Sequence, residues 1–187
     1  MKIIARDEDA PLVASVLAAF PPALAVLVEA HCDVVRILEP TERFADVGKT
    51  YASADRIDYG VCGGLYDPRQ RTVIIKDRNP YVTAHELVHA VDHVLGDGTK
   101  PRSLLDPDVD AAYRRHRRDG VAISAYSMVN RVEFVAEHLR ALLGFSPPRP
   151  PGRPSDIDRV RRVDAALCTA FEDWLRDAEM IAKEQAA

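Results

Sequence analysis

The feature that most constrains this chain is the segment from His85 to His89, which reads His-Glu-Leu-Val-His. Apolar residues recur around it at three- and four-residue spacing, which predicts a buried helix. On a helix, side chains four residues apart lie on one face, with about 5–6 Å between their Cβ atoms. Two imidazoles placed in this way can bind one zinc ion, and Glu86 then lies beside the open coordination position as a general base.

A catalytic zinc ion takes three protein ligands, so the two histidines leave one ligand to be found. His93 stands about 12 Å from His85 along a straight helix, because each residue adds about 1.5 Å, and the three histidines cannot share one ion. The longer zinc-peptidase pattern would place its third histidine at position 95, which is Leu95. A carboxylate on a second helix is the remaining choice.

A second helix is predicted from Tyr126 to Leu143, where apolar residues repeat with helical period and Gly144 supplies the stop. Glu133 and Glu137 lie one turn apart on this helix. The predicted second helix therefore carries two candidate carboxylates.

The two helices together resemble the lethal-factor-like zinc metallopeptidases. That family pairs a His-Glu-x-x-His-Ala-x-Asp helix with a later tyrosine, seven residues before the first glutamate of Glu-Phe-x-Ala-Glu. Here the matching residues are 85–92, Tyr126 and 133–137, and Gly63 to Asp67 resembles the edge hairpin of the family. The likeness covers roughly residues 57–143.

The resemblance implies that His85, His89 and Glu133 are the zinc ligands. It also implies that Glu86 is the base and that Tyr126 donates a hydrogen bond to the oxyanion of the reaction.

Glu137, one turn beyond Glu133, is predicted to orient a ligating imidazole through its other ring nitrogen; the alternative is a surface carboxylate. Asp92, three residues after His89, is predicted either to support a ligand in the same way or to pair with a nearby cation. The chain departs from many family members at Val88, where they have glycine. We expect this residue to alter the fit of the helix against a substrate.

The predicted fold is α+β and zincin-like, with a small mixed sheet, an active-site helix and a second helix that carries the glutamate ligand. Helices are predicted for 9–20, capped by Asp9, and from 22 towards 31, followed by a strand over 33–39. Segments 61–66 and 72–76 predict a hairpin. Its paired glycines, Gly63 and Gly64, allow another backbone to approach closely. One interpretation is a peptide substrate bound along the edge strand from Gly63 to Tyr66, and the alternative is a bulge in the strand.

The predicted domain boundaries lie at the two ends of a proline-rich segment. Residues 1–146 are predicted to form the metallopeptidase domain, and 147–154 an extended proline-rich connector that could instead recruit a partner. Residues 155–187 are predicted to form one amphipathic helix, which starts near Ser155 and packs on the domain or on another subunit.

Composition narrows the class of protein. The 187 residues are 47% hydrophobic and 29% charged, as in a soluble globular domain, and the net charge of −4 favours neither nucleic acid nor membrane as a partner. The basic run from Tyr113 to Arg118 is interpreted as a solvated helix face, or as a cleft rim that favours an acidic substrate. The acidic start of the chain predicts no signal peptide, hence cytoplasmic synthesis; export as an effector by a specialised system is the alternative.

The sequence therefore predicts a zinc-dependent endopeptidase with Zn²⁺ as its cofactor, and a protease of toxin or effector type is one form that it could take. Within the peptidases, a cytoplasmic regulatory metalloprotease is an alternative. A hypothesis of another class is a catalytically inactive, zinc-stabilised module that binds proteins through the hairpin edge and the proline run.

Overall fold

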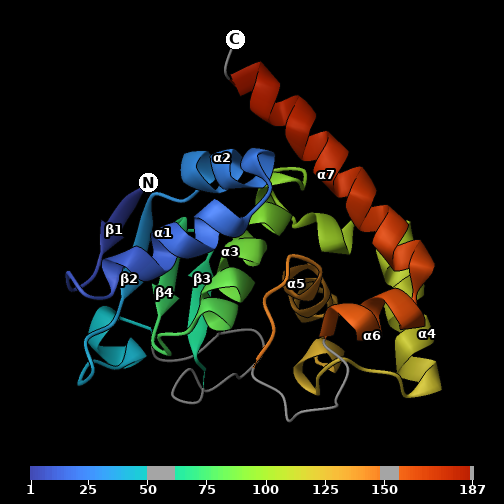
Figure 1. The fold of residues 1–187 in the computed structure, drawn as a ribbon, viewed down its shortest axis with the longest axis horizontal. Helices are drawn as coiled ribbons and strands as arrows, with labels where there is room; N and C mark the ends of the chain where they lie inside the picture. Colours follow the sequence, from blue (N-terminus) through green and yellow to red (C-terminus); the bar gives the residue numbers. More distant parts are fainter. Residues whose placement is uncertain (50–61, 148–155, 186–187) are drawn as a thin grey trace.

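The computed structural model describes residues 1–49, 62–147 and 156–185, which form a mixed α and β structure (Figure 1). The strands are β1 (Lys2–Ile4), β2 (Val34–Ile37), β3 (Gly64–Asp67) and β4 (Thr72–Ile75). The α-helices are α1 (Ala10–Ala19), α2 (Pro22–His31), α3 (Pro80–Val94), α4 (Pro107–Asp119), α5 (Arg131–Leu142), α6 (Asp156–Val163) and α7 (Ala165–Gln185). Short 3-10 turns are η1 (Phe44–Val47), η3 (Arg102–Leu104) and η4 (Tyr126–Met128).

The sheet is small and mixed, with the strand order β1-β2-β4-β3. Strands β1, β2 and β4 run parallel, while β3 pairs antiparallel with β4 as the predicted hairpin and forms one edge. The turn between them is held by Asp67, whose Oδ1 accepts the backbone N–H groups of Arg69 and Gln70 at 2.9 and 3.2 Å. Strand β1 was not predicted, because three residues are too few for a periodicity to show.

Helix α3 is the centre of the fold. It contacts β3 and β4 on one side and α5 on the other, as Figure 1 shows. Asn79 caps it by accepting the Val82 N–H at 2.8 Å, and Pro80 fits its first turn, where no N–H partner is needed. Leu87 and Val91 are fully buried. Packing on two sides therefore fixes the rotation of α3, and with it the direction of its histidines.

The predicted helix over residues 126–143 is interrupted. Tyr126 belongs to the short turn η4, and α5 begins only at Arg131. Between them Asn130 is extended, with φ −157° and ψ 176°, and its side chain caps α5 by accepting the Glu133 N–H at 2.9 Å. The apolar pattern continued through the break because η4 also packs against α5.

The C-terminal segment forms two helices rather than the one predicted. The break falls at Asp164, whose Oδ1 accepts the Leu167 N–H at 3.0 Å and so caps α7. Helix α7 packs on α2 and α4, with Phe171 and Trp174 in the main core. Phe171 and Trp174 of this helix therefore pack on the rest of the domain. The predicted connector beyond Pro147, and the predicted cap at Ser155, lie outside the described residues.

Two further predictions concern charged residues. Asp9 precedes α1 but makes no cap; its carboxylate instead accepts hydrogen bonds from Arg6 and Arg78 at 2.8 and 2.9 Å. The basic run lies on α4, where Arg114 pairs with Asp110 at 2.9 Å. Across the described ranges, no helix is both long and apolar enough to cross a bilayer.

Buried His138 on α5 predicts acid sensitivity. Its Nδ1–H donates to the Phe134 carbonyl at 2.7 Å, and its Nε2 has no partner among the described residues. Burial lowers the pKa of His138 from 6.5 to about 4. The unfolded chain then binds the proton more tightly, so stability should fall as the pH drops below about 6.5, and the loss should level off below about 4.

We expect His138→Leu to remove most of this contribution, which amounts to about 3 kcal/mol at the acid limit. The measurement is urea unfolding of the metal-free protein across that pH range. An unchanged slope of stability against pH in the variant would contradict the prediction.

Candidate metal centre

Three side chains from two helices converge beside the sheet. His85 and His89 come from successive turns of α3, and Glu133 comes from the first turn of α5. His85 Nε2 lies 3.0 Å from Glu133 Oε2 and 3.1 Å from His89 Nε2, and His89 Nε2 lies 3.4 Å from the same carboxylate oxygen. These three residues form a group that could hold a metal ion.

The hydrogen-bonding roles of His85 show what this group requires. Its Nδ1 lies 3.0 Å from Glu137 Oε1, and because a carboxylate only accepts, Nδ1 carries the hydrogen. In the neutral ring Nε2 is then an acceptor, yet it faces the Glu133 carboxylate, which is also an acceptor. Burial opposes a charged ring, but hydrogen bonds with Glu133 and Glu137 outweigh it and raise the pKa of His85 to about 10. The group therefore favours a positive charge, which a proton or a metal ion can supply.

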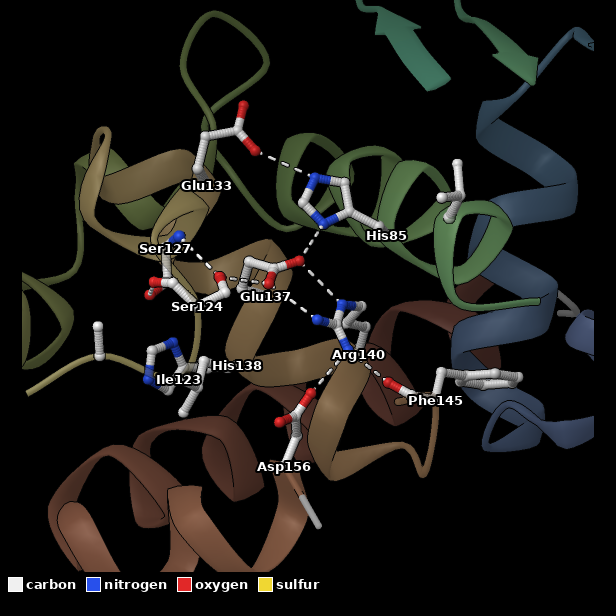
Figure 2. A network of polar contacts seen from close by, with 12 residues as sticks. His85, Ile123, Ser124, Ser127, Glu133, Glu137, His138, Arg140, Phe145 and Asp156 are labelled. Atoms are coloured by element: carbon white, nitrogen blue, oxygen red, sulfur yellow. Dashed lines mark hydrogen bonds and ion pairs between the residues drawn. The ribbon is translucent and has the colours of Figure 1, made fainter. Parts of the chain in front are cut away.

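Glu137 lies behind His85, in the place predicted for a carboxylate that orients a ligand (Figure 2). It also accepts from Ser124 Oγ at 2.6 Å and from Arg140 Nε and Nη2 at 2.9 and 2.8 Å. Although burial alone would raise it, the hydrogen bonds from His85 and Arg140 hold the pKa of Glu137 well below its usual range. Glu137 is therefore an ionised carboxylate buried against the imidazole rather than a surface group.

Glu86 lies over the edge strand. A Cβ atom built on Gly64 would meet the Glu86 Cγ at 2.5 Å and Oε1 at 2.7 Å, and one on Gly63 would meet Asp77 Oδ2 at 2.8 Å. The paired glycines therefore admit two carboxylate side chains. The Gly63 carbonyl also accepts the N–H groups of both Lys76 and Asp77 at 2.8 Å, which is the pattern of a bulge. Burial raises the pKa of Glu86, and the backbone N–H of Tyr66 donates to it.

This contact makes a prediction about Gly64. We expect Gly64→Ala to keep the fold and the metal but to displace the Glu86 carboxylate, because the clash is with the end of a flexible side chain. A displacement of about 1 Å at a reacting group can cost about 10²-fold in rate. Steady-state kinetics and metal content measure both effects. Gly63→Ala is the matched control, since it meets only Asp77, and equal losses in the two variants would contradict the role given to Gly64.

Tyr126 extends over the group from the turn η4 rather than from α5. Its ring centroid lies 5.7 Å from that of His85, and 41% of the residue is exposed. Burial, and then the nearby charge of Glu133, raise the pKa of Tyr126, so its hydroxyl stays protonated and can donate.

Two cavities meet at Glu86 and Tyr126, which line both of them. The larger has a volume of about 510 Å³ and extends past His85 to Tyr81 and Arg140. The smaller, of about 210 Å³, extends past His89 and Glu133. The two cavities together leave open space on both sides of the candidate metal centre.

Other predicted or candidate residues lie elsewhere. The Asp92 carboxylate accepts the Ser103 N–H at 2.7 Å and, within the described ranges, makes no hydrogen bond to a histidine of the group, so it braces η3 against α3. His93 packs on the ring of Tyr66, with centroids 5.4 Å apart, and His138 is buried behind α5. Neither belongs to the candidate metal group.

Sequence reasoning missed Ser124 and Arg140. Arg140 lies three residues after Glu137, so helical spacing alone could have indicated their pairing. Ser124 precedes η4 and carries no sequence signal of this kind.

The comparisons with known proteins add no family. No protein-family model matches this chain, and no curated protein sequence matches it either. The candidate site is therefore defined by its own residues.

Proposed function

We propose that this protein is a zinc-dependent endopeptidase with a zincin-like arrangement of sheet, active-site helix and glutamate helix. The observation that carries the proposal is the convergence of His85, His89 and Glu133. In a tetrahedral site with bonds of about 2.0–2.2 Å, ligand atoms lie about 3.3–3.6 Å apart. The separations of 3.0, 3.1 and 3.4 Å are close to that spacing, and two imidazoles with one carboxylate form a donor set that zinc prefers.

The chain's own residues supply the remaining chemistry. When bound, zinc lowers the pKa of a coordinated water and polarises a carbonyl oxygen. The Glu86 carboxylate would take a proton from the attacking water and pass it to the nitrogen of the departing amine. The Tyr66 N–H holds the carboxylate in place.

Among the described residues no further strand pairs with the outer edge of β3, and this edge suits an extended peptide. The carbonyl of Gly63 accepts the Lys76 N–H at 2.8 Å, so the backbone groups of Gly63 face β4. Because these groups alternate along a strand, those of Gly64 face outward, beside Glu86. An added strand could pair with them, which would place its carbonyl between the metal group and Tyr126.

Tyr126 would donate to the oxygen of that carbonyl as negative charge develops there. We expect Tyr126→Phe to keep the fold and the metal, while kcat falls by about 10²–10³, the usual cost of one oxyanion donor. Steady-state kinetics with metal analysis are the measurement. A phenylalanine variant with full kcat and full metal would show that the ring only packs against His85.

The proposed function is tested by metal analysis of the purified protein and by mass spectrometry of a peptide library incubated with it. We expect one zinc ion per chain and cleaved peptides whose amounts increase with time. Zinc without cleavage would favour a zinc-stabilised binding module instead. Absence of zinc, with no gain on adding it, would overturn the proposal.

A further inference from the structure

We propose that Asp156, at the start of α6, is a positioning residue for the metal centre and acts through Arg140 and Glu137 on His85. The inference rests on the proposed metal site and adds to it a residue from the C-terminal segment. Figure 2 shows the chain of contacts, which runs from α6 through α5 to α3.

The first step is the dependence of Glu137 on Arg140. Four donors surround the Glu137 carboxylate, and two of them are the Nε and Nη2 groups of Arg140. Such a parallel pair of hydrogen bonds fixes both the position and the plane of a carboxylate. The orientation of Glu137 therefore follows that of the guanidinium, and the His85 ring follows Glu137.

The second step is what fixes Arg140. Its side chain is only 3% exposed, and one edge of the guanidinium is engaged by Glu137. On the other edge, Nη1 donates to the Phe145 carbonyl at 2.6 Å and lies 3.5 Å from Asp156 Oδ2. The Tyr81 ring lies 5.7 Å from the guanidinium carbon. Among the described residues, Asp156 is the one carboxylate at the outer edge of Arg140.

The third step is the burial of Asp156 itself. The residue is 1% exposed, and its other oxygen lies 3.7 Å from Arg159 Nη1. A charge this deeply buried persists only when it is paired, and here two cations face it. Without it, one edge of Arg140 would be held by a neutral carbonyl alone, and the guanidinium could turn towards the 510 Å³ cavity that it lines.

The consequence is that a segment distant in sequence completes the support of a metal ligand. Partners that orient a ligating imidazole typically affect metal affinity by about 10–100-fold when they are removed. Asp156 acts on His85 only through Arg140 and Glu137. Its removal should therefore weaken zinc binding by a factor near the lower end of that range.

The experiment measures zinc affinity by competition with a chelator, and the visible spectrum of the cobalt-substituted protein, for wild type, Asp156→Ala and Asp156→Asn. We expect about 10-fold weaker zinc binding and an altered cobalt spectrum in the alanine variant. Asp156→Asn keeps the shape and one acceptor, so it provides a folded variant if alanine unfolds the chain. It should weaken binding by a smaller factor.

Asp164→Asn is the matched control. Asp164 is a buried carboxylate of the same C-terminal segment that faces Arg115 and His116 and caps α7. Within the described residues, none of its hydrogen bonds or ion pairs reaches Arg140. Its substitution should lower stability and leave zinc affinity within about 3-fold of wild type, because it is distant from the network.

A double-mutant cycle with Arg140→Lys separates positioning from packing. If Asp156 acts through Arg140, removing it from the lysine variant should cost little further affinity, because coupled residues are not additive. Wild-type zinc affinity in folded Asp156→Ala, an equal loss in Asp164→Asn, or additive losses in the cycle would each overturn the inference. Failure of the proposed function would show differently, as absence of zinc binding in the wild type.

Discussion

Glu86→Gln is expected to abolish peptide hydrolysis in a protein that still folds and still holds its metal. The amide has the shape of the carboxylate and can keep the hydrogen bond from the Tyr66 N–H, but it cannot accept the proton of the attacking water. Removal of a general base costs about 10²–10⁴-fold in rate. Progress curves on a cleaved library peptide, with metal content measured on the same samples, provide the test.

The control for this variant is Glu179→Gln, an exposed glutamate on α7 that should leave both rate and metal unchanged. Hydrolysis by Glu86→Gln at close to the wild-type rate would exclude the peptidase assignment. Loss of metal together with activity would instead show that Glu86 supports the metal group, which it does not contact in the geometry described above.

Glu133→Ala is expected to lose zinc affinity by more than about 100-fold, beyond the usual effect of a residue that only supports a ligand. The carboxylate is the sole anionic member of the candidate group, and it lies within 3.4 Å of both imidazoles. Its removal leaves two neutral donors where three had converged. Equilibrium dialysis of the purified variant against zinc measures the loss.

His93→Ala is the matched comparison. His93 is a half-buried histidine on the same helix as His85 and His89, but it packs on Tyr66 instead of joining the group. Its zinc affinity should remain near that of the wild type. A steep loss in His93→Ala, with Glu133→Ala unaffected, would reverse the assignment of the third ligand.

Local geometry explains what could be predicted for the candidate site. The alignment of His85 and His89 depends only on four-residue spacing in a helix, and the apolar positions around them specify that helix. The cap at Asn130 also acts over three residues, but it was missed because apolar residues continue across it. The hairpin was predictable for the same reason, since its turn is closed by neighbouring residues.

Long-range packing decided the rest. Helices α3 and α5 are far apart in sequence, and only their contact in the fold brings Glu133 to the histidines and places Glu137 behind His85. From the sequence, the role of Glu133 was implied by resemblance, and that of Glu137 was predicted from its place one turn beyond Glu133. The position of Glu86 over Gly64 likewise depends on how α3 lies across β3, which no local pattern specifies.

The sequence by itself determined the helix that carries His85, Glu86 and His89, and the chemistry of those side chains, because both are properties of a few adjacent residues. The tertiary structure alone decided that Tyr126 approaches from a separate turn, and that Asp156 reaches Arg140 from beyond the proline-rich segment. The physical reason is that hydrogen-bond partners of buried charges are chosen by the packing of whole helices. That packing depends on the entire core rather than on the spacing of neighbours.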